Sequence, residues 1–250
     1  MSITPFLRFK LVAPLFIVLL TLGCTREKPE TTGLVGHYIN RTFLEASRDS
    51  IPGMVGNYCH ELNFVSKDSV LIFYGFEEAV LGYEKTGDKY LIKNALGDKD
   101  MSFFIDPYHN LILQDSSWTK LNVNSIFTKS YPADTQKWTF ETELNKTLIA
   151  GSYTLFENNL PTSKQVTLSP DGRVDGLANF TNYELCFSGD CVGEVTPISN
   201  NITFTNSKDS SVVYAVKFGQ KKRFKLYNIE KPEEDIKGER EIIDLAFDFR

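Results

Sequence analysis

The chain has 250 residues, with 27 lysines and arginines against 32 aspartates and glutamates, and a formal net charge of −5 at pH 7. Because proteins that bind nucleic acids need concentrated basic side chains, this balance argues against a nucleic-acid partner. Once residues 1–23 are set aside, the remaining length suits one large domain or two ordinary ones.

The N-terminal segment predicts export. Arg8 and Lys10 precede an almost uninterrupted apolar run over residues 11–22. A helix of that length rises about 18 Å, which is too short to cross a hydrocarbon core of about 30 Å. A basic start, a short apolar middle and a small-residue end are typical of a secretory signal peptide, here residues 1–23.

The end of this segment, LTLGC at residues 20–24, resembles a bacterial lipobox. The resemblance implies cleavage before Cys24 and acylation of that cysteine, which makes the lipid bilayer a partner of the protein. It also implies more than one acyl chain, since a single chain holds a membrane only marginally. Residues 24–33 then form a polar tether. The expected location is the cell envelope, on an outer membrane that faces the periplasm or the cell surface.

Short alternating runs fill the rest of the chain. Examples are YLIKN, SFFID and VVYAVKF, and turn signals such as SKDS, TGDK and SPDGR separate them. Short strands with turn signals about every 8–12 residues are typical of an antiparallel sandwich or barrel. No window of helical length keeps a clean helical period. The sequence therefore predicts an all-β fold.

The chain also repeats itself. A Gly-x-Tyr opens a strand at residues 36–38 and again at residues 151–153. Counted from the Gly-x-Tyr, the positions of five later turn signals agree within two residues between the copies if the first copy contains twelve extra residues near its start. The predicted segments are a first copy over residues 34–129, a polar linker over residues 130–147 and a second copy over residues 148–250.

A Gly-x-aromatic that opens the first of roughly eight up-and-down strands resembles the lipocalin-like (calycin) barrels. Tandem versions of these barrels occur among lipoproteins of Gram-negative bacteria. The resemblance implies two tandem antiparallel barrels, each either filled by side chains or holding one small ligand. Two immunoglobulin-like sandwiches are the alternative fold, although they need longer Greek-key crossovers than these evenly spaced turns supply.

The twelve extra residues lie in the segment LEASRDSIPGMVGN, residues 44–57. A barrel of this kind would place such a loop across its open mouth. Ile51, Met54 and Val55 are apolar, and two glycines permit unusual backbone angles. Loops of this length are functional lids or plain insertions, and both interpretations stay open here.

Strand alternation places several aromatic side chains of the first copy on one face. A cavity lined by them would bind a small apolar or amphipathic ligand. The candidate ligand-binding residues are Tyr58, His60, Phe64, Tyr83, Phe103, Ile51, Met54 and Val55. The alternative is that these side chains fill the barrel, and that the barrels are non-enzymatic interaction modules for an unidentified protein of the envelope.

Residues suited to catalysis are sparse. The spacing between the cysteines and the three histidines, His37, His60 and His109, does not match a zinc site. The sequence contains no GxSxG, no phosphate loop and no HExxH. Cys59 adjoins His60, but alternation places the two on opposite faces of a strand. The sequence predicts no catalytic residues, no metal and no cofactor, and therefore no enzyme.

The remaining cysteines predict a disulfide between Cys186 and Cys191. If Ser188 and Gly189 form a two-residue hairpin loop, the cysteines lie opposite each other at a non-hydrogen-bonded pair, with Cα atoms about 4.5 Å apart. Export supplies an oxidising compartment. The rival is a metal-binding cysteine pair, which would need further ligands. Cys59 is then left unpaired.

Overall fold

The computed structural model describes residues 34–114, 125–131, 138–188, 195–230 and 240–250. The predicted signal peptide, Cys24, the tether and Cys191 lie outside these residues. Within them, the helices are too short and too polar to cross a membrane.

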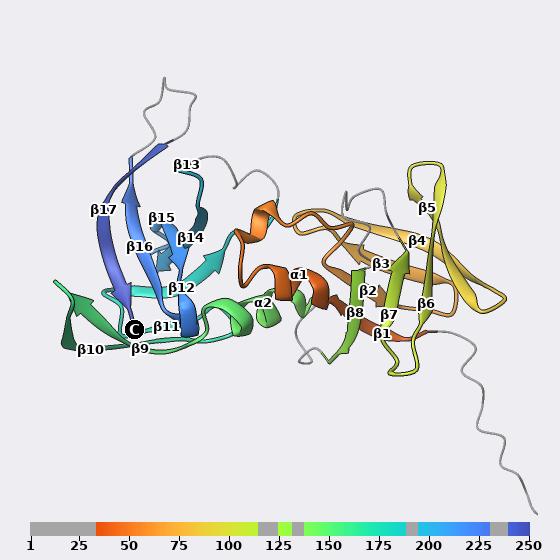
Figure 1. Ribbon diagram of the computed structural model, residues 1–250, viewed down its shortest axis with the longest axis horizontal. Coiled ribbons are helices and arrows are strands. Elements are labelled where there is room, and N and C mark those ends of the chain that lie inside the picture. Colours follow the sequence, from red (N-terminus) through yellow and green to blue (C-terminus); the bar gives the residue numbers. More distant parts are fainter. Residues whose placement is uncertain (1–33, 115–124, 132–137, 189–194, 231–239) are drawn as a thin grey trace, which may run out of the picture. The chain divides into compact units, whose positions relative to one another are not determined.

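The first half of the chain is a closed antiparallel barrel of eight strands (Figure 1). The strands are β1 (Gly36–Asn40), β2 (Glu61–Phe64), β3 (Ser69–Phe73), β4 (Glu78–Thr86), β5 (Lys89–Leu96), β6 (Lys99–Ile105), β7 (Leu111–Gln114) and β8 (Ser125–Ser130). Each pairs with the next along the chain, and β1 pairs with β8 to close the ring. The prediction of an all-β chain with an eight-stranded up-and-down barrel is confirmed for this half.

Side chains fill the interior of the barrel. Because alternate residues of a strand point to one face, the inward positions of the strands form one apolar cluster. The most deeply buried members are Cys59, Leu62, Phe64, Val70, Ile72, Ile92, Phe103, Leu111, Leu113 and Phe127. The ring of Phe64 lies 4.9 Å from that of Tyr83 and 5.7 Å from that of Phe103, measured between centroids. An eight-stranded barrel is just wide enough to be packed in this way.

The second half forms a nine-stranded sheet. Its strands are β9 (Gly151–Glu157), β10 (Leu160–Leu168), β11 (Val174–Asp175), β12 (Phe180–Leu185), β13 (Val195–Thr196), β14 (Asn200–Asn206), β15 (Ser211–Phe218), β16 (Phe224–Ile229) and β17 (Arg240–Phe249). The main order is β11-β10-β9-β17-β16-β15-β14-β12, and β13 pairs in parallel with β17.

This sheet is open between β11 and β12, where the sequence predicts a second closed barrel. One backbone bridge from Arg173 to Asn182, and a 2.6 Å hydrogen bond from the Tyr183 N–H to the Gly172 carbonyl, join its ends. β11 is only two residues long because the chain turns on both sides of it. Gly172 and Gly176 make these turns with φ of 83° and 81°, which favour glycine. A strand of two residues is too short to form the backbone hydrogen-bond ladder with β12 that would close a second barrel.

The helices are α1 (Arg41–Ala46) and α2 (Phe140–Leu148), with 3-10 turns at Pro52–Met54 and Gln220–Lys222. The Asn40 side chain caps α1 by accepting the Phe43 N–H at 2.9 Å. The second part of the segment predicted as a polar linker, residues 130–147, contains α2. Phe140, Leu144 and Leu148 recur every four residues and are buried, but the repeat is too short to stand out in a helical window.

One hydrophobic core extends across both halves of the chain. It combines inward residues of the second sheet with Phe140, Leu144 and Leu148 of α2. It also includes Ile39 and Phe73, which point outward from the barrel, and Phe43 and Leu44 of α1. Residues 33–250 accordingly form one compact unit.

Candidate functional site

Glu61 is a buried carboxylate on the outer face of the barrel. It lies on β2 opposite Ile39 of β1, and its neighbour Leu62 points into the barrel, so the Glu61 side chain points outward. Its exposed fraction is nevertheless 0%. Burial of an ionised carboxylate costs free energy unless the group is paired and hydrogen-bonded.

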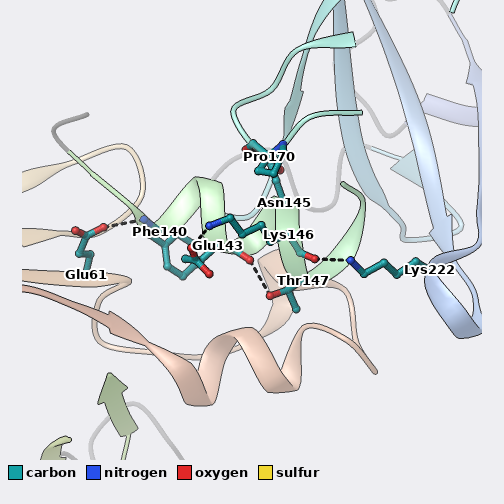
Figure 2. Close-up of polar contacts among 8 residues, drawn as sticks. All are labelled: Glu61, Phe140, Glu143, Asn145, Lys146, Thr147, Pro170 and Lys222. Atoms are coloured by element: carbon teal, nitrogen blue, oxygen red, sulfur yellow. Dashed lines mark hydrogen bonds and ion pairs between the residues drawn. The ribbon is translucent and has the colours of Figure 1, made fainter. Parts of the chain in front are cut away.

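The partners of Glu61 come from the start of α2. Glu61 Oε2 accepts the backbone N–H groups of Thr139 and Phe140 at 2.7 and 2.8 Å. Thr139 is the N-cap of the helix and Phe140 its first residue, and Figure 2 shows the bond from Phe140. On the other carboxylate oxygen, His37 Nδ1 lies 2.5 Å from Glu61 Oε1. The carboxylate thus satisfies two free helix donors at the positive end of the helix dipole.

The opposite end of α2 contacts a cation. Lys222 Nζ donates to the Lys146 carbonyl oxygen at 2.8 Å (Figure 2). It also donates to the Ala150 carbonyl oxygen at 3.4 Å. Midway along the helix, Asn145 Nδ2 donates to the Pro170 carbonyl at 3.0 Å. A carboxylate at the N-terminus and an ammonium at the C-terminus both complement the helix dipole. Barrel residues therefore hold one end of α2, and residues of the second half hold the other.

His60 lies beside this contact in an aromatic cage. Its ring centroid is 4.6 Å from that of Phe43, 4.5 Å from that of Phe140 and 5.0 Å from that of Phe187. Its Nδ1 has no hydrogen-bond partner among the described residues. Burial lowers the pKa of His60 to about 3, so the imidazole is neutral near pH 7.

The Cys59 thiol is a poor candidate for a nucleophile. The side chain is fully buried within the barrel cluster, and burial raises the pKa of its thiol well above the usual value, with the Glu61 charge adding to the effect. A protonated thiol is a poor nucleophile. In the part of the chain that the structure describes, no group of three or more His, Cys, Asp and Glu side chains is arranged to hold a metal.

The predicted ligand-binding residues separate into different environments. Phe64, Tyr83 and Phe103 lie in the packed barrel interior. Tyr58 is buried at its edge, where its hydroxyl donates to the Ala95 carbonyl at 2.9 Å. His60 instead contacts the core outside the barrel, because β2 begins only at Glu61 and strand alternation does not extend back to residue 60.

The segment over residues 44–57 faces the second half of the chain. Val55 packs against the core that spans both halves, while Met54 is exposed. Ile51 lines a groove together with Ile198 and Phe218. The sequence indicates either a lid or a plain insertion here, and its local pattern does not identify the residues that these apolar side chains contact.

This groove has a volume of about 570 Å³, within the range of small-molecule sites. Its residues come from three separate parts of the sequence: Arg48, Asp49, Ser50 and Ile51; Ile198, Ser199 and Asn200; and Val216, Lys217, Phe218, Gly219 and Gln220. Of these, sequence reasoning had selected Ile51 alone, because nothing in the linear pattern links the three parts.

Cys186 is disulfide-bonded. Its backbone is also fixed, since its N–H donates to the Asn201 carbonyl at 2.9 Å and its carbonyl accepts from Asn200 Nδ2 at 2.6 Å. Because Cys191 lies outside the described residues, its pairing with Cys186 stays a prediction. Cys59 is a free, buried cysteine.

No protein-family model, curated protein or solved structure matches this chain.

Proposed function

We propose that the chain is a non-enzymatic interaction module of the cell envelope, anchored to a membrane through acylated Cys24 and built on a lipocalin-like barrel. The observation that carries this proposal is the packed interior of the first barrel. Leu62, Phe103 and Phe127 each have an exposed fraction of 0%, and they lie among other buried apolar side chains.

A ligand inside this barrel would have to displace at least one ring. Removing a buried phenylalanine side chain costs about 3–5 kcal/mol, and a small apolar ligand must offset that cost as well as its own loss of freedom. The packed interior thus favours the interaction-module hypothesis over a ligand held within the barrel.

We further infer that the second half is an incomplete copy of the same barrel. Read around the sheet, its strands run β9, β10, β11, β12, β14, β15, β16 and β17, which returns to β9. This up-and-down order is that of the first barrel, and the Arg173–Asn182 bridge lies where a closing ladder would form. The shared order supports the tandem lipocalin-like architecture over two immunoglobulin-like sandwiches, whose Greek-key connections would reorder the strands.

A protein partner needs an exposed surface, and the outside of the barrel provides one. Val80 on β4 is 66% exposed and pairs with Leu71 on β3, while Val65 follows β2 and is also exposed. Phe76, in the turn between β3 and β4, is 69% exposed. We call these four residues the β3–β4 patch. Val80 and Leu71 lie side by side on the outer face of the barrel, and exposed apolar side chains that lie together are typical of interaction sites.

Site-specific photo-cross-linking tests this function. A photoreactive residue at Val80 should form discrete adducts with envelope proteins in intact cells that make the chain. The matched control is Val212 on β15, a valine that is 41% exposed outside the patch. Adducts at Val80 that the charged substitution Phe76→Glu abolishes would support the proposal. No adduct at Val80, or the same adducts from Val212, would contradict it.

A further inference from the structure

The groove at residues 48–51 combines apolar walls with a basic rim. Ile51, Ile198 and Phe218 are among its apolar lining residues, and Ile198 is 51% exposed. A second hollow of about 340 Å³ shares Arg48, Asp49, Phe218, Gly219 and Gln220 with the first, and also reaches Leu148 and Lys222 near the end of α2. The two hollows are therefore neighbours on the surface, with these five residues between them.

Positive charge predominates at this rim, although the whole chain carries a net charge of −5. The ionisable residues are Arg48, Lys217 and Lys222 against one acid, Asp49. Lys222 is occupied with the carbonyl groups at the end of α2. Neither Arg48 nor Lys217 has a carboxylate within ion-pair distance in the described ranges, and Lys217 Nζ lies 5.1 Å from the centroid of the Tyr227 ring.

The lining also includes two buried polar residues, Ser199 and Asn200. Asn200 uses its amide nitrogen to bind the Cys186 carbonyl. Ser199 Oγ and Asn200 Oδ1, in contrast, have no hydrogen-bond partner among the residues that the structure describes. Buried polar atoms are ordinarily satisfied, and these two atoms lie beneath the surface of the groove.

We propose that this groove binds a small amphipathic anion, a medium-chain carboxylate, with its charged group at Arg48 and Lys217 and its alkyl chain against Ile51, Ile198 and Phe218. Guanidinium and ammonium groups without carboxylate partners recognise a carboxylate through charge-assisted hydrogen bonds. Ile198 is exposed and Ile51 and Phe218 are half-buried, so these walls gain from covering an alkyl chain. The site is separate from the barrel interior and from the β3–β4 patch, so it goes beyond the proposed function.

The proposal also gives a role to the extra residues of the first copy. Arg48, Asp49, Ser50 and Ile51 all belong to the segment over residues 44–57, which has no counterpart of equal length in the second copy. The segment supplies one of the two cations and one of the apolar walls. In this account the segment completes a binding groove against the second half, and it does not gate the barrel.

The test is a titration of the Cys24→Ser chain, which lacks the acyl anchor, with decanoate and with decanol. Calorimetry gives the affinity, and methyl NMR signals of Ile51 and Ile198 locate the ligand. We expect saturable decanoate binding, with decanol about tenfold weaker because it lacks the charge. Arg48→Gln together with Lys217→Gln should weaken decanoate at least about tenfold and leave decanol unchanged. Ile198→Glu should abolish binding, whereas Ile243→Glu, at a 63% exposed isoleucine on β17, should not.

Each contrary result has a distinct meaning. Absence of decanoate binding, equal binding of decanol, or an unchanged affinity in the double variant would overturn the groove proposal and leave the proposed function intact. Decanoate shifts confined to methyl groups of the barrel interior, such as Leu62 and Val70, would overturn both, since the barrel would then hold the ligand.

Discussion

The contact between Glu61 and α2 predicts a large effect of one substitution. Glu61→Ala removes the acceptor of the Thr139 and Phe140 N–H groups and the partner of His37, all without exposing the site to water. A buried donor left without an acceptor costs about 1–3 kcal/mol, and removal of one member of a buried charged contact costs about 3–5 kcal/mol. We therefore expect Glu61→Ala to lower the free energy of unfolding by about 3–5 kcal/mol.

Two further variants isolate the cause. Glu61→Gln keeps the shape and one acceptor oxygen but loses the charge, so we expect a loss of about 1–2 kcal/mol, the difference between charged and neutral hydrogen bonds. Glu84→Ala is the control, since Glu84 is an exposed strand glutamate that pairs with Lys93 at 2.9 Å. An exposed ion pair contributes about 0–1 kcal/mol.

Urea unfolding of the Cys24→Ser chain gives these free energies, and hydrogen exchange at Thr139 and Phe140 reports locally on the helix start. We expect both amides to exchange faster in Glu61→Ala and to be unchanged in Glu84→Ala. If Glu61→Ala and Glu84→Ala unfold with the same free energy, or if the two amides keep their protection, Glu61 does not hold α2 and the reasoning fails.

Three other predictions concern the buried histidine and the cysteines. Below pH 6.5 the unfolded state binds a proton at His60, whereas the buried imidazole stays neutral in the folded state down to about pH 3. The free energy of unfolding should therefore fall by about 1.4 kcal/mol per pH unit between pH 6.5 and pH 3. Urea unfolding at several pH values should show a shallower dependence of this free energy on pH in His60→Phe but not in His109→Gln. An equal slope in all three chains would refute this cause. Labelled palmitate should enter the wild-type chain and not Cys24→Ser, and equal labelling would reject the anchor. If Cys186 pairs with Cys191 as predicted, thiol titration of the acylated, oxidised protein under denaturant should detect Cys59 alone. Two additional thiols would show that the predicted pairing is wrong.

The barrel was predictable from the sequence because its determinants are local. Alternation places Phe64, Tyr83 and Phe103 on one face of successive strands, and short polar turns join these strands in order. The same reasoning predicts closure of the second sheet, where it fails. Closure there depends on the length of β11, which the turns at Gly172 and Gly176 limit to two residues.

The contacts around α2 were not predictable, because they join residues far apart in the sequence. Glu61 and Thr139 are separated by 78 positions, and nothing near Glu61 marks it as buried. Strand alternation alone predicts that a glutamate on the outer face of a barrel is exposed to solvent. The groove has the same property, since its cations Arg48 and Lys217 come from opposite ends of the folded chain. Tertiary packing, which local patterns do not encode, creates both features.

The claim that the first barrel is filled has the most direct test. Methyl NMR of the Cys24→Ser chain, titrated with benzene, reports on the interior through Leu62, Val70 and Leu113. We expect these signals to stay unchanged in the otherwise wild-type chain. They should shift in Phe103→Ala, where the lost ring leaves an apolar cavity of the kind that binds benzene. Saturable shifts without the Phe103→Ala substitution would show an open interior and contradict the account.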